Sequence, residues 1–306
     1  MGFSYIIYKL LNKLTLFGFC LTSRNYGPLL ICAKNIRNKN LIFDFSDETT
    51  HLGDRLFFFP LFSALLEENI SFYIKDPSLI TQNLYHAICN KRLQNFAVSK
   101  DPIFVLPSSS LLANARKWNR LILIDFHREA AGSITNSIVA NFGKLLDTDL
   151  KEKNSEESFG RHTRAPEKPI SQKFVFFNNY IWSGKFRTLL LNEQKLHDKC
   201  NNLRNLGFSI VHVGSAHERS TDRKLYEFVD LDLRGKLALP ELVRLMASDT
   251  NFGVVTYDNF LMHLAGIFNK PAYVLFRGRL SRRKREHHFA SINPTFFKNK
   301  SLIKYL

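Results

Sequence analysis

At 306 residues the chain is long enough for two domains that each bury a core, and its hydrophobic content of 45% excludes an intrinsically disordered protein. Its four scattered cysteines, Cys20, Cys32, Cys89 and Cys200, have neither metal-ligand spacing nor the density of a disulfide framework, which suits a reducing compartment. The net charge of +16 predicts an anionic partner: nucleic acid, anionic lipid or a phosphorylated substrate.

Residues 1–38 are predicted to form an N-terminal amphipathic extension. Its apolar residues recur at steps of three and four, which places them on one helical face: Phe3, Ile7, Leu10, Leu14, Phe17 and Leu21. The apolar run 14–21 is too short to span a bilayer, and no small-x-small cleavage site follows it. We expect either a basic helix that lies on a membrane surface or a helix that packs on the protein's own core.

Residues 39–165 are predicted to form a first Rossmann-like domain, because strands and helices alternate as in βαβ units with a parallel sheet. The expected strands are 40–45, 71–74, 103–106 and 121–125, and the expected helices are 54–69 and 133–146. The polar stretch 147–172, with Pro166 and Pro169, is the expected linker.

Residues 166–306 are predicted to form a second Rossmann-like domain, because the alternation restarts there. The expected strands are 173–177, 209–213, 252–256 and 272–276, and the expected helices are 192–206, 240–247 and 259–268. The predicted fold is therefore α/β, with two Rossmann-like domains whose parallel sheets face each other across a ligand cleft.

The segment 254–266 is a candidate phosphate site. A β-branched run ends in a polar turn, and an apolar helix follows. Asp258 is expected to cap that helix, whose first backbone N–H groups then offer a positive dipole end to an anion. The alternative is a capped helix in the core with no ligand.

A second candidate site follows the first expected strand. Gly53 permits a tight loop, and Asp54 is expected to open the next helix at the carboxyl edge of the sheet. There its carboxylate could accept a proton from an attacking hydroxyl. The alternative is again a helix cap.

Two loops of the second domain carry further candidates. Lys185, in the Ser-Gly-Lys stretch 183–185, could meet a diphosphate, although the P-loop spacing is absent. In the stretch 212–218, Gly214 allows close backbone approach and Glu218 could hold ribose hydroxyls. His212 and His217 have no third ligand at useful spacing, so metal binding is disfavoured.

Missing motifs argue against several classes of protein. The absence of Gly-x-Gly-x-x-Gly disfavours a dehydrogenase, and the absence of Gly-x-Ser-x-Gly disfavours an α/β-hydrolase. No Asp-x-Asp follows a strand as in metal-dependent transferases, and no nucleic-acid-binding motif is present. The basic run 277–288 is either a solvated loop or a contact for anionic lipid or phosphate.

Two patterns together resemble glycosyltransferase family 9, the lipopolysaccharide heptosyltransferases. The first is Gly-Asp-x-Leu-x-x-x-Pro-Leu-x-x-x-Leu at 53–65, and the second comprises 232–249, 258–265 and 270–276. The resemblance implies a GT-B fold, with an acceptor domain at 39–165, a donor domain at 166–306, and inverting, metal-independent transfer. It implies that Asp54 is the base. It further implies that the donor contacts Lys185, Gly214, Glu218, Leu237, Asp258, Asn259, Phe260 and His263.

The resemblance thus predicts sugar transfer, of heptose or a hexose-like sugar, from a nucleotide-sugar donor. The implied acceptor is a lipopolysaccharide or other envelope glycan, and the implied location is the cytoplasmic inner face of the inner membrane. No cofactor besides the nucleotide-sugar co-substrate is expected. Asn259 and Phe260 replace the family's Thr and Gly, which keeps open an inactive GT-B scaffold in an envelope-polysaccharide complex. A basic nucleic-acid binder is a third alternative.

Overall fold

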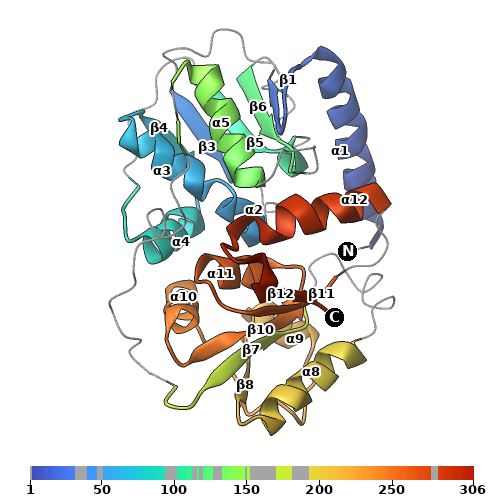
Figure 1. Cartoon of the computed structure of the whole chain (residues 1–306). Helices are drawn as coiled ribbons and strands as arrows, with labels where there is room; N and C mark the ends of the chain where they lie inside the picture. The colour runs from blue at the N-terminus through green and yellow to red at the C-terminus, as the bar shows by residue number, and fades with distance from the viewer. Residues whose placement is uncertain are drawn as a thin grey trace. The chain divides into compact units, whose positions relative to one another are not determined.

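The computed structural model describes residues 2–31, 40–46, 51–93, 102–111, 116, 120–126, 133–148, 150–151, 170–180, 193–276 and 282–306 (Figure 1). The chain divides into two compact units. The N-terminal unit comprises Met1–Ser158 and Glu286–Ile292, and the C-terminal unit comprises Phe159–Arg285 and Asn293–Leu306. The predicted boundary at 165/166 lies outside the described residues.

The N-terminal unit contains a six-stranded sheet in the order β1-β2-β6-β5-β3-β4. Its strands are β1 (Arg24–Tyr26), β2 (Leu29–Ile31), β3 (Leu41–Asp44), β4 (Phe72–Lys75), β5 (Ile103–Pro107) and β6 (Leu121–Ile124). The last four are parallel, as predicted. β1 and β2 are antiparallel additions at one edge, and Leu29 of β2 pairs with Ile124 of β6. The predicted extension therefore contributes two strands to the sheet.

Helices surround an aromatic core in this unit. They are α2 (Leu52–Leu56), α3 (Phe59–Glu67), α4 (Ile80–Cys89), α5 (Ile134–Leu146) and the 3₁₀ turn η1 (Ser108–Ser110). The ring of Phe43 on β3 packs edge-to-face on Phe62 of α3, at 4.8 Å between centroids. The single predicted helix 54–69 is two helices, because Pro60 lacks a backbone N–H and stands in the first turn of α3.

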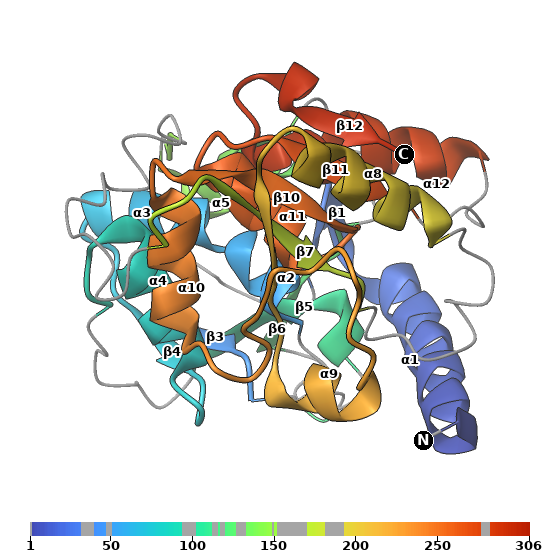
Figure 2. The same cartoon turned by 90° about the horizontal axis from the view of Figure 1, so that it is seen from below.

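α1 (Gly2–Thr22) lies at the periphery of the N-terminal unit in both views (Figures 1 and 2). One face packs on the unit: Phe19 is fully buried in a cluster with Leu30 and Leu121, and Leu16 packs against that cluster. Asn12 Nδ2 also donates to the Ser108 carbonyl at 3.1 Å. The prediction of a helix packed on its own core is confirmed for this face. No helix in the described part of the chain is long and apolar enough to cross a membrane.

The C-terminal unit contains a fully parallel sheet in the order β12-β11-β10-β7-β8-β9. Its strands are β7 (Phe174–Asn178), β8 (Ser209–His212), β9 (Leu231–Asp232), β10 (Asn251–Tyr257), β11 (Ala272–Leu275) and β12 (Ile303–Tyr305). Its helices include α8 (Gln194–Asn205), α9 (Ala216–Thr221), α10 (Leu239–Ala247) and α11 (Phe260–Ile267). Figure 1 shows α8 and α11 on opposite sides of this sheet.

The last part of the chain belongs to both units. α12 (Arg282–His287) begins in the C-terminal unit and ends in the N-terminal unit, where the π-helix η3 (His288–Ile292) continues it. The 3₁₀ turns η4 (Asn293–Phe296) and η5 (Lys300–Leu302) then return to the C-terminal unit. Residues 277–281 of the predicted basic run lie outside the described residues.

Candidate functional site

Three strand ends meet at one edge of the C-terminal sheet. β7 ends at Asn178, Gly214 follows β8, and Asn259 follows β10. β7 pairs in parallel with both β8 and β10, so the carboxyl ends of all three strands lie side by side. In open α/β sheets this edge is where ligands bind.

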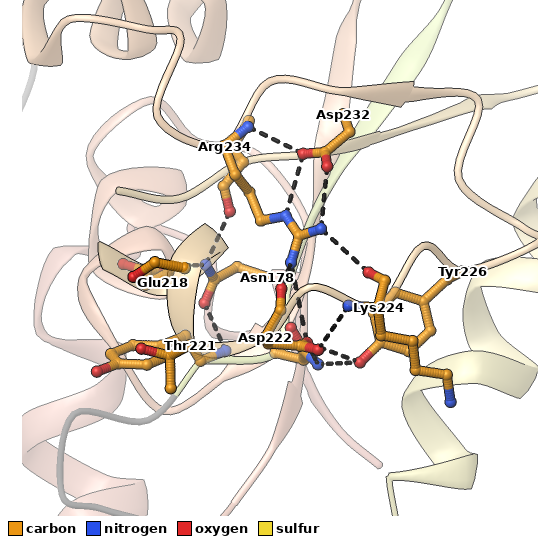
Figure 3. Close-up of polar contacts among 12 residues, drawn as sticks. Asn178, Glu218, Thr221, Asp222, Lys224, Tyr226, Asp232 and Arg234 are labelled. Atoms are coloured by element: carbon orange, nitrogen blue, oxygen red, sulfur yellow. Dashed lines mark hydrogen bonds and ion pairs between the residues drawn. The ribbon is translucent and has the colours of Figure 1, made fainter. Parts of the chain in front are cut away.

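Asn178 connects these strand ends through its side-chain amide. Its Nδ2 donates to Glu218 Oε2 at 2.8 Å and to the Val213 carbonyl at 2.8 Å (Figure 3). Its Oδ1 accepts from Asn259 Nδ2 at 3.0 Å and from the Tyr180 backbone N–H at 3.0 Å. The structure therefore brings together two predicted donor residues, Glu218 and Asn259, through a residue that the sequence did not single out. The position of Asn178 at the end of a buried strand was the available signal.

Glu218 is held in place by the first turn of α9. Ser215 caps this helix by accepting from the Glu218 backbone N–H at 3.2 Å, and its hydroxyl donates to Glu218 Oε1 at 3.2 Å. Burial raises the pKa of the Glu218 carboxyl above its usual value, and the hydrogen bond from Asn178 offsets part of this rise. A carboxylate in this position can accept hydrogen bonds from a ligand's hydroxyl groups.

Gly214 is required for the approach of Glu218. A Cβ atom at this position would lie 2.3 Å from Glu218 Oε2 and 3.3 Å from Asn178 Nδ2. In the structure the space at Gly214 is used by an internal hydrogen-bonded cluster, and the close approach of a ligand to its backbone stays a prediction. We call Asn178, Gly214, Glu218 and Asn259 the strand-end cluster.

The predicted cap of α11 was wrong by one residue. Asn259, not Asp258, is the N-cap: its backbone is extended, and its Oδ1 accepts from the Leu261 N–H at 3.0 Å. The reason is that β10 continues to Tyr257, which is completely buried, and so shifts the turn by one position. Thr256 Oγ1 also donates to Asn259 Oδ1 at 3.0 Å, which fixes the side chain. The N-terminus of α11 still stands at the sheet edge expected for an anion.

The other predicted donor residues have different surroundings. Asp258 and Phe260 flank the cap and are half-buried, and Leu237 is half-buried just before α10. His263 is buried in α11, and its ring packs edge-to-face on Phe296 at 5.6 Å between centroids. Lys185 lies outside the described residues.

A second polar network, centred on Arg234, adjoins the strand-end cluster (Figure 3). Arg234 is only 2% exposed, and its guanidinium donates from Nε and Nη2 to the two oxygens of Asp232, at 3.0 and 2.9 Å. Nη1 and Nη2 also donate to the carbonyls of Asp222 and Lys224, at 2.7 and 3.1 Å. Burial alone would raise the Asp232 pKa, but the hydrogen bonds from Arg234 lower it to about 2. The ion pair of Arg234 with Asp232, together with its two hydrogen bonds to backbone carbonyls, therefore holds the segment 222–234 in place.

Gly235 attaches this loop to the strand-end cluster. Its φ is +70°, and a Cβ there would lie 2.8 Å from the Ala216 Cα. The Gly235 N–H donates to the Gly214 carbonyl at 2.8 Å. An open pocket of about 480 Å³ lies beside it, lined among others by Arg219, Arg223 and Arg234.

The N-terminal unit carries the predicted base, Asp54. It is the third residue of α2, not its first, because the helix begins at Leu52 with His51 as the N-cap. The half-buried Asp54 carboxylate accepts a hydrogen bond from the His51 backbone N–H, as acids in capping boxes do. Burial raises its pKa to about 6, against the opposing effects of that hydrogen bond and of Arg55. A carboxylate with this pKa is suited to accept a proton near neutral pH.

Arg55 anchors α2 to the core. Its guanidinium donates to Asp76 and Thr81, and it lies over the Phe45 ring at 5.4 Å from the centroid. Arg55 and Asp76 are each 5% exposed. This buried ion pair holds the residue next to Asp54 and thereby fixes the position of α2, the helix that carries it. Sequence reasoning did not single out either member.

The described residues contain no group of three or more His, Cys, Asp or Glu side chains placed to hold a metal ion. His212 is buried against Phe177, with 4.7 Å between ring centroids. Burial, and secondly the charge of Arg234, lower its pKa to about 4, so this imidazole is neutral at physiological pH.

Solved glycosyltransferases share the architecture of this chain. The glycosyl transferase family 9 protein from Veillonella parvula DSM 2008 has a TM-score of 0.56 and 14% identity, over 90% of this chain and 88% of that one. The E. coli heptosyltransferase WaaC with ADP has a TM-score of 0.55 and 12% identity, over 87% and 92%. WaaC with ADP-2-deoxy-2-fluoro heptose has a TM-score of 0.52 and 13% identity, over 79% and 90%. No protein-family model and no curated protein matches the sequence.

The sequence identities to these structures are too low to transfer an activity to this chain. The similarities therefore show the fold alone. The prediction of an α/β protein of GT-B fold is confirmed. The activity has to be inferred from the strand-end cluster and Asp54.

Proposed function

We propose that this protein is an inverting, metal-independent glycosyltransferase that uses a nucleotide-sugar donor. The observation that carries the proposal is the strand-end cluster, which places a half-buried carboxylate, two amides and a helix N-terminus at the ligand-binding edge of a parallel sheet. The GT-B fold supports the proposal, and WaaC, which shares that fold, is described with ADP and with an ADP-sugar analogue.

The donor would be bound by complementary groups. Glu218 would accept hydrogen bonds from ribose hydroxyls, as acids in Rossmann-like sites do. The N-terminus of α11, between Asp258 and Phe260, would hold the diphosphate, with Lys185 as its cation. Leu237 would provide apolar contact for the base.

Transfer would occur by a single displacement. Asp54 would take the proton from an acceptor hydroxyl, whose oxygen attacks the anomeric carbon while the bond to the nucleoside diphosphate breaks. Configuration at that carbon inverts, and the diphosphate leaves with the bonding electron pair. The positive groups at the strand edge would stabilise this developing charge. The acceptor in this proposal is a lipopolysaccharide or other envelope glycan, met at the inner face of the inner membrane, and the sugar is a heptose or hexose-like sugar.

Binding of nucleoside diphosphates tests the donor site. Thermal unfolding with ADP, GDP or UDP should show that at least one raises the Tm of the protein, because a ligand stabilises the state it binds. Glu218→Gln should weaken that binding about tenfold, since a charged acceptor is lost. Glu227→Gln, at an exposed position of the same unit, is the matched control and should bind like the parent protein.

A second candidate function rests on Phe260. A phenylalanine at the first position of α11 brings bulk where the resemblance predicts glycine, and so favours an inactive GT-B scaffold in a polysaccharide assembly complex. In that case none of the three diphosphates, nor any nucleotide sugar, would raise the Tm.

A further inference from the structure

One face of α1 is apolar and exposed to solvent. The exposed fractions are 60% for Leu14, 66% for Phe17 and 72% for Leu21, and Ile7, Leu10 and Leu11 are exposed beside them. Of the twelve large apolar side chains exposed in the described part of the chain, these six lie on one helix. Isolated apolar residues are ordinary on a protein surface, whereas a gathered set marks an interaction surface.

The packing of α1 fixes which way this face points. The exposed residues follow one another at steps of three and four, so they form one continuous stripe. Phe19 and Leu16 lie on the other side and pack on the core of the N-terminal unit. The helix is thus held with its apolar stripe outward. Its 21 residues correspond to a length of about 32 Å along the surface.

The charge around α1 indicates what covers the stripe. Residues 1–43 contain no acidic residue, and their basic residues are Lys9, Lys13, Arg24, Lys34, Arg37 and Lys39. Lys13 and Arg24 are exposed. Two copies joined through α1 would bring Lys13 and Arg24 of one copy near those of the other, which disfavours self-association. A surface of anionic lipid headgroups attracts the same charges, at about 1 kcal/mol per basic residue near the surface in general.

We propose that α1 lies flat in the headgroup layer of an anionic lipid bilayer, with its stripe of Leu10, Leu14, Phe17 and Leu21 in the acyl boundary. α1 is not long and apolar enough to cross the membrane, so it holds the protein on one surface. The inference deepens the proposed function, because it names the surface where the enzyme would meet a glycolipid acceptor. Its functional interpretation rests on the proposed function.

Vesicle binding of the full-length chain tests this directly. Cosedimentation would compare vesicles of equal parts phosphatidylglycerol and phosphatidylcholine with vesicles of phosphatidylcholine alone. The pair Leu14→Gln with Leu21→Gln removes two members of the stripe while keeping good helix formers. The pair Leu206→Gln with Leu225→Gln is the matched control, because these leucines are 73% and 74% exposed in the C-terminal unit.

The expected result is binding to the anionic vesicles that weakens with salt and falls at least about tenfold in the α1 pair. The control pair should bind within about twofold of the parent protein. Circular dichroism and thermal unfolding establish that both pairs fold. Failure of the parent protein to bind anionic vesicles, or equal binding by the α1 pair, would overturn the proposal. So would a concentration-dependent dimer that the α1 pair abolishes without any vesicle binding. No donor or acceptor is present, so the result is independent of the test with nucleoside diphosphates.

Discussion

The amide of Asn178 donates to the carboxylate of Glu218 at 2.8 Å, and the same amide receives a hydrogen bond from Asn259 at 3.0 Å. This one side chain therefore couples the ends of β7, β8 and β10. A displacement of Asn259, at the phosphate end of the candidate donor site, would therefore be transmitted to Glu218, at the ribose end, through this single residue. Asn178 is thus a positioning residue for the proposed donor.

Asn178→Asp should make stability depend on pH. The substitution keeps the shape of the side chain but puts a second carboxylate against Glu218, and two such groups cannot both ionise easily. The folded pair would retain a proton that the unfolded chain releases, so stability should fall as pH rises from about 5 to about 8, by about 2 kcal/mol. Urea unfolding across this range measures the effect. Asn202→Asp, exposed on α8, adds the same charge without that neighbour and should show almost none of it. A pH-independent loss in Asn178→Asp would contradict the coupling.

Alanine substitutions at two glycines with positive φ can distinguish the cost of backbone strain from the cost of a steric clash. Gly207 has φ +87°, and a Cβ atom added there would have nothing within 4 Å, whereas at Gly235 the Ala216 backbone would lie 2.8 Å away. Gly207→Ala should therefore cost only the conformational penalty, about 1 kcal/mol. Gly235→Ala should cost about 3 kcal/mol and weaken nucleoside diphosphate binding, because it displaces the Gly214 loop. Equal losses in the two variants, measured by urea unfolding, would show that the contact with Ala216 does not matter.

Sequence patterns predicted most elements of the two sheets, because buried strands such as β6 and β7 are nearly continuous apolar runs. They located α11 but not its cap, since nothing local shows that Tyr257 is still part of the strand. They missed β1 and β2, because three-residue strands are too short for a periodic signal and are stabilised by pairing with β6.

The candidate site was predictable only where the residue type itself suggested chemistry. Asp54 follows Gly53 directly, Glu218 lies four residues after Gly214, and the resemblance to a family reinforced both. Asn178 and Arg234 depend on partners that are distant in sequence: Asn178 bonds Asn259, 81 residues away. The packing of His263 against Phe296 is likewise a tertiary contact that no local pattern encodes.

The Arg55–Asp76 pair should be important for stability, because it is buried. Asp76→Asn leaves the Arg55 charge without its partner, at an expected cost of about 3 kcal/mol. Burial raises the Asp76 pKa, but hydrogen bonds from Ser78 and Thr81 and the charge of Arg55 lower it overall. Its contribution is therefore present at neutral pH and is lost as pH falls below the usual carboxyl range. The parent protein should lose stability in acid more steeply than Asp76→Asn.

The control for this prediction is Glu67→Gln, which breaks an exposed pair with Lys91 and should cost under about 0.5 kcal/mol. A similar loss of stability in both variants would refute the role of burial.

Asp54→Asn should stabilise the protein while it abolishes transfer. The folded pKa of Asp54 is raised from 3.8 to about 6, so the folded state holds the proton more tightly than the unfolded state does. Stability associated with this group is present below about pH 4 and is lost as pH rises through 6. Asparagine cannot ionise and can still accept from the His51 N–H. The variant should therefore gain about 1 kcal/mol above pH 6, less than the full linkage value because the side chain is only half-buried, and gain nothing in acid.

The same titration predicts the pH dependence of the reaction. A general base must be ionised, so transfer by the parent protein should decline as pH falls below about 6, and Asp54→Asn should show no transfer at any pH. Urea unfolding and a transfer assay with whichever nucleotide sugar binds provide the two readouts. Glu68→Gln, exposed at the end of α3, is the control and should alter neither. Loss of transfer without the pH-dependent gain in stability would leave Asp54 essential but place its carboxylate in a different environment. Retention of full transfer would remove Asp54 as the base, because a reaction that proceeds without this carboxylate takes its proton acceptor from elsewhere.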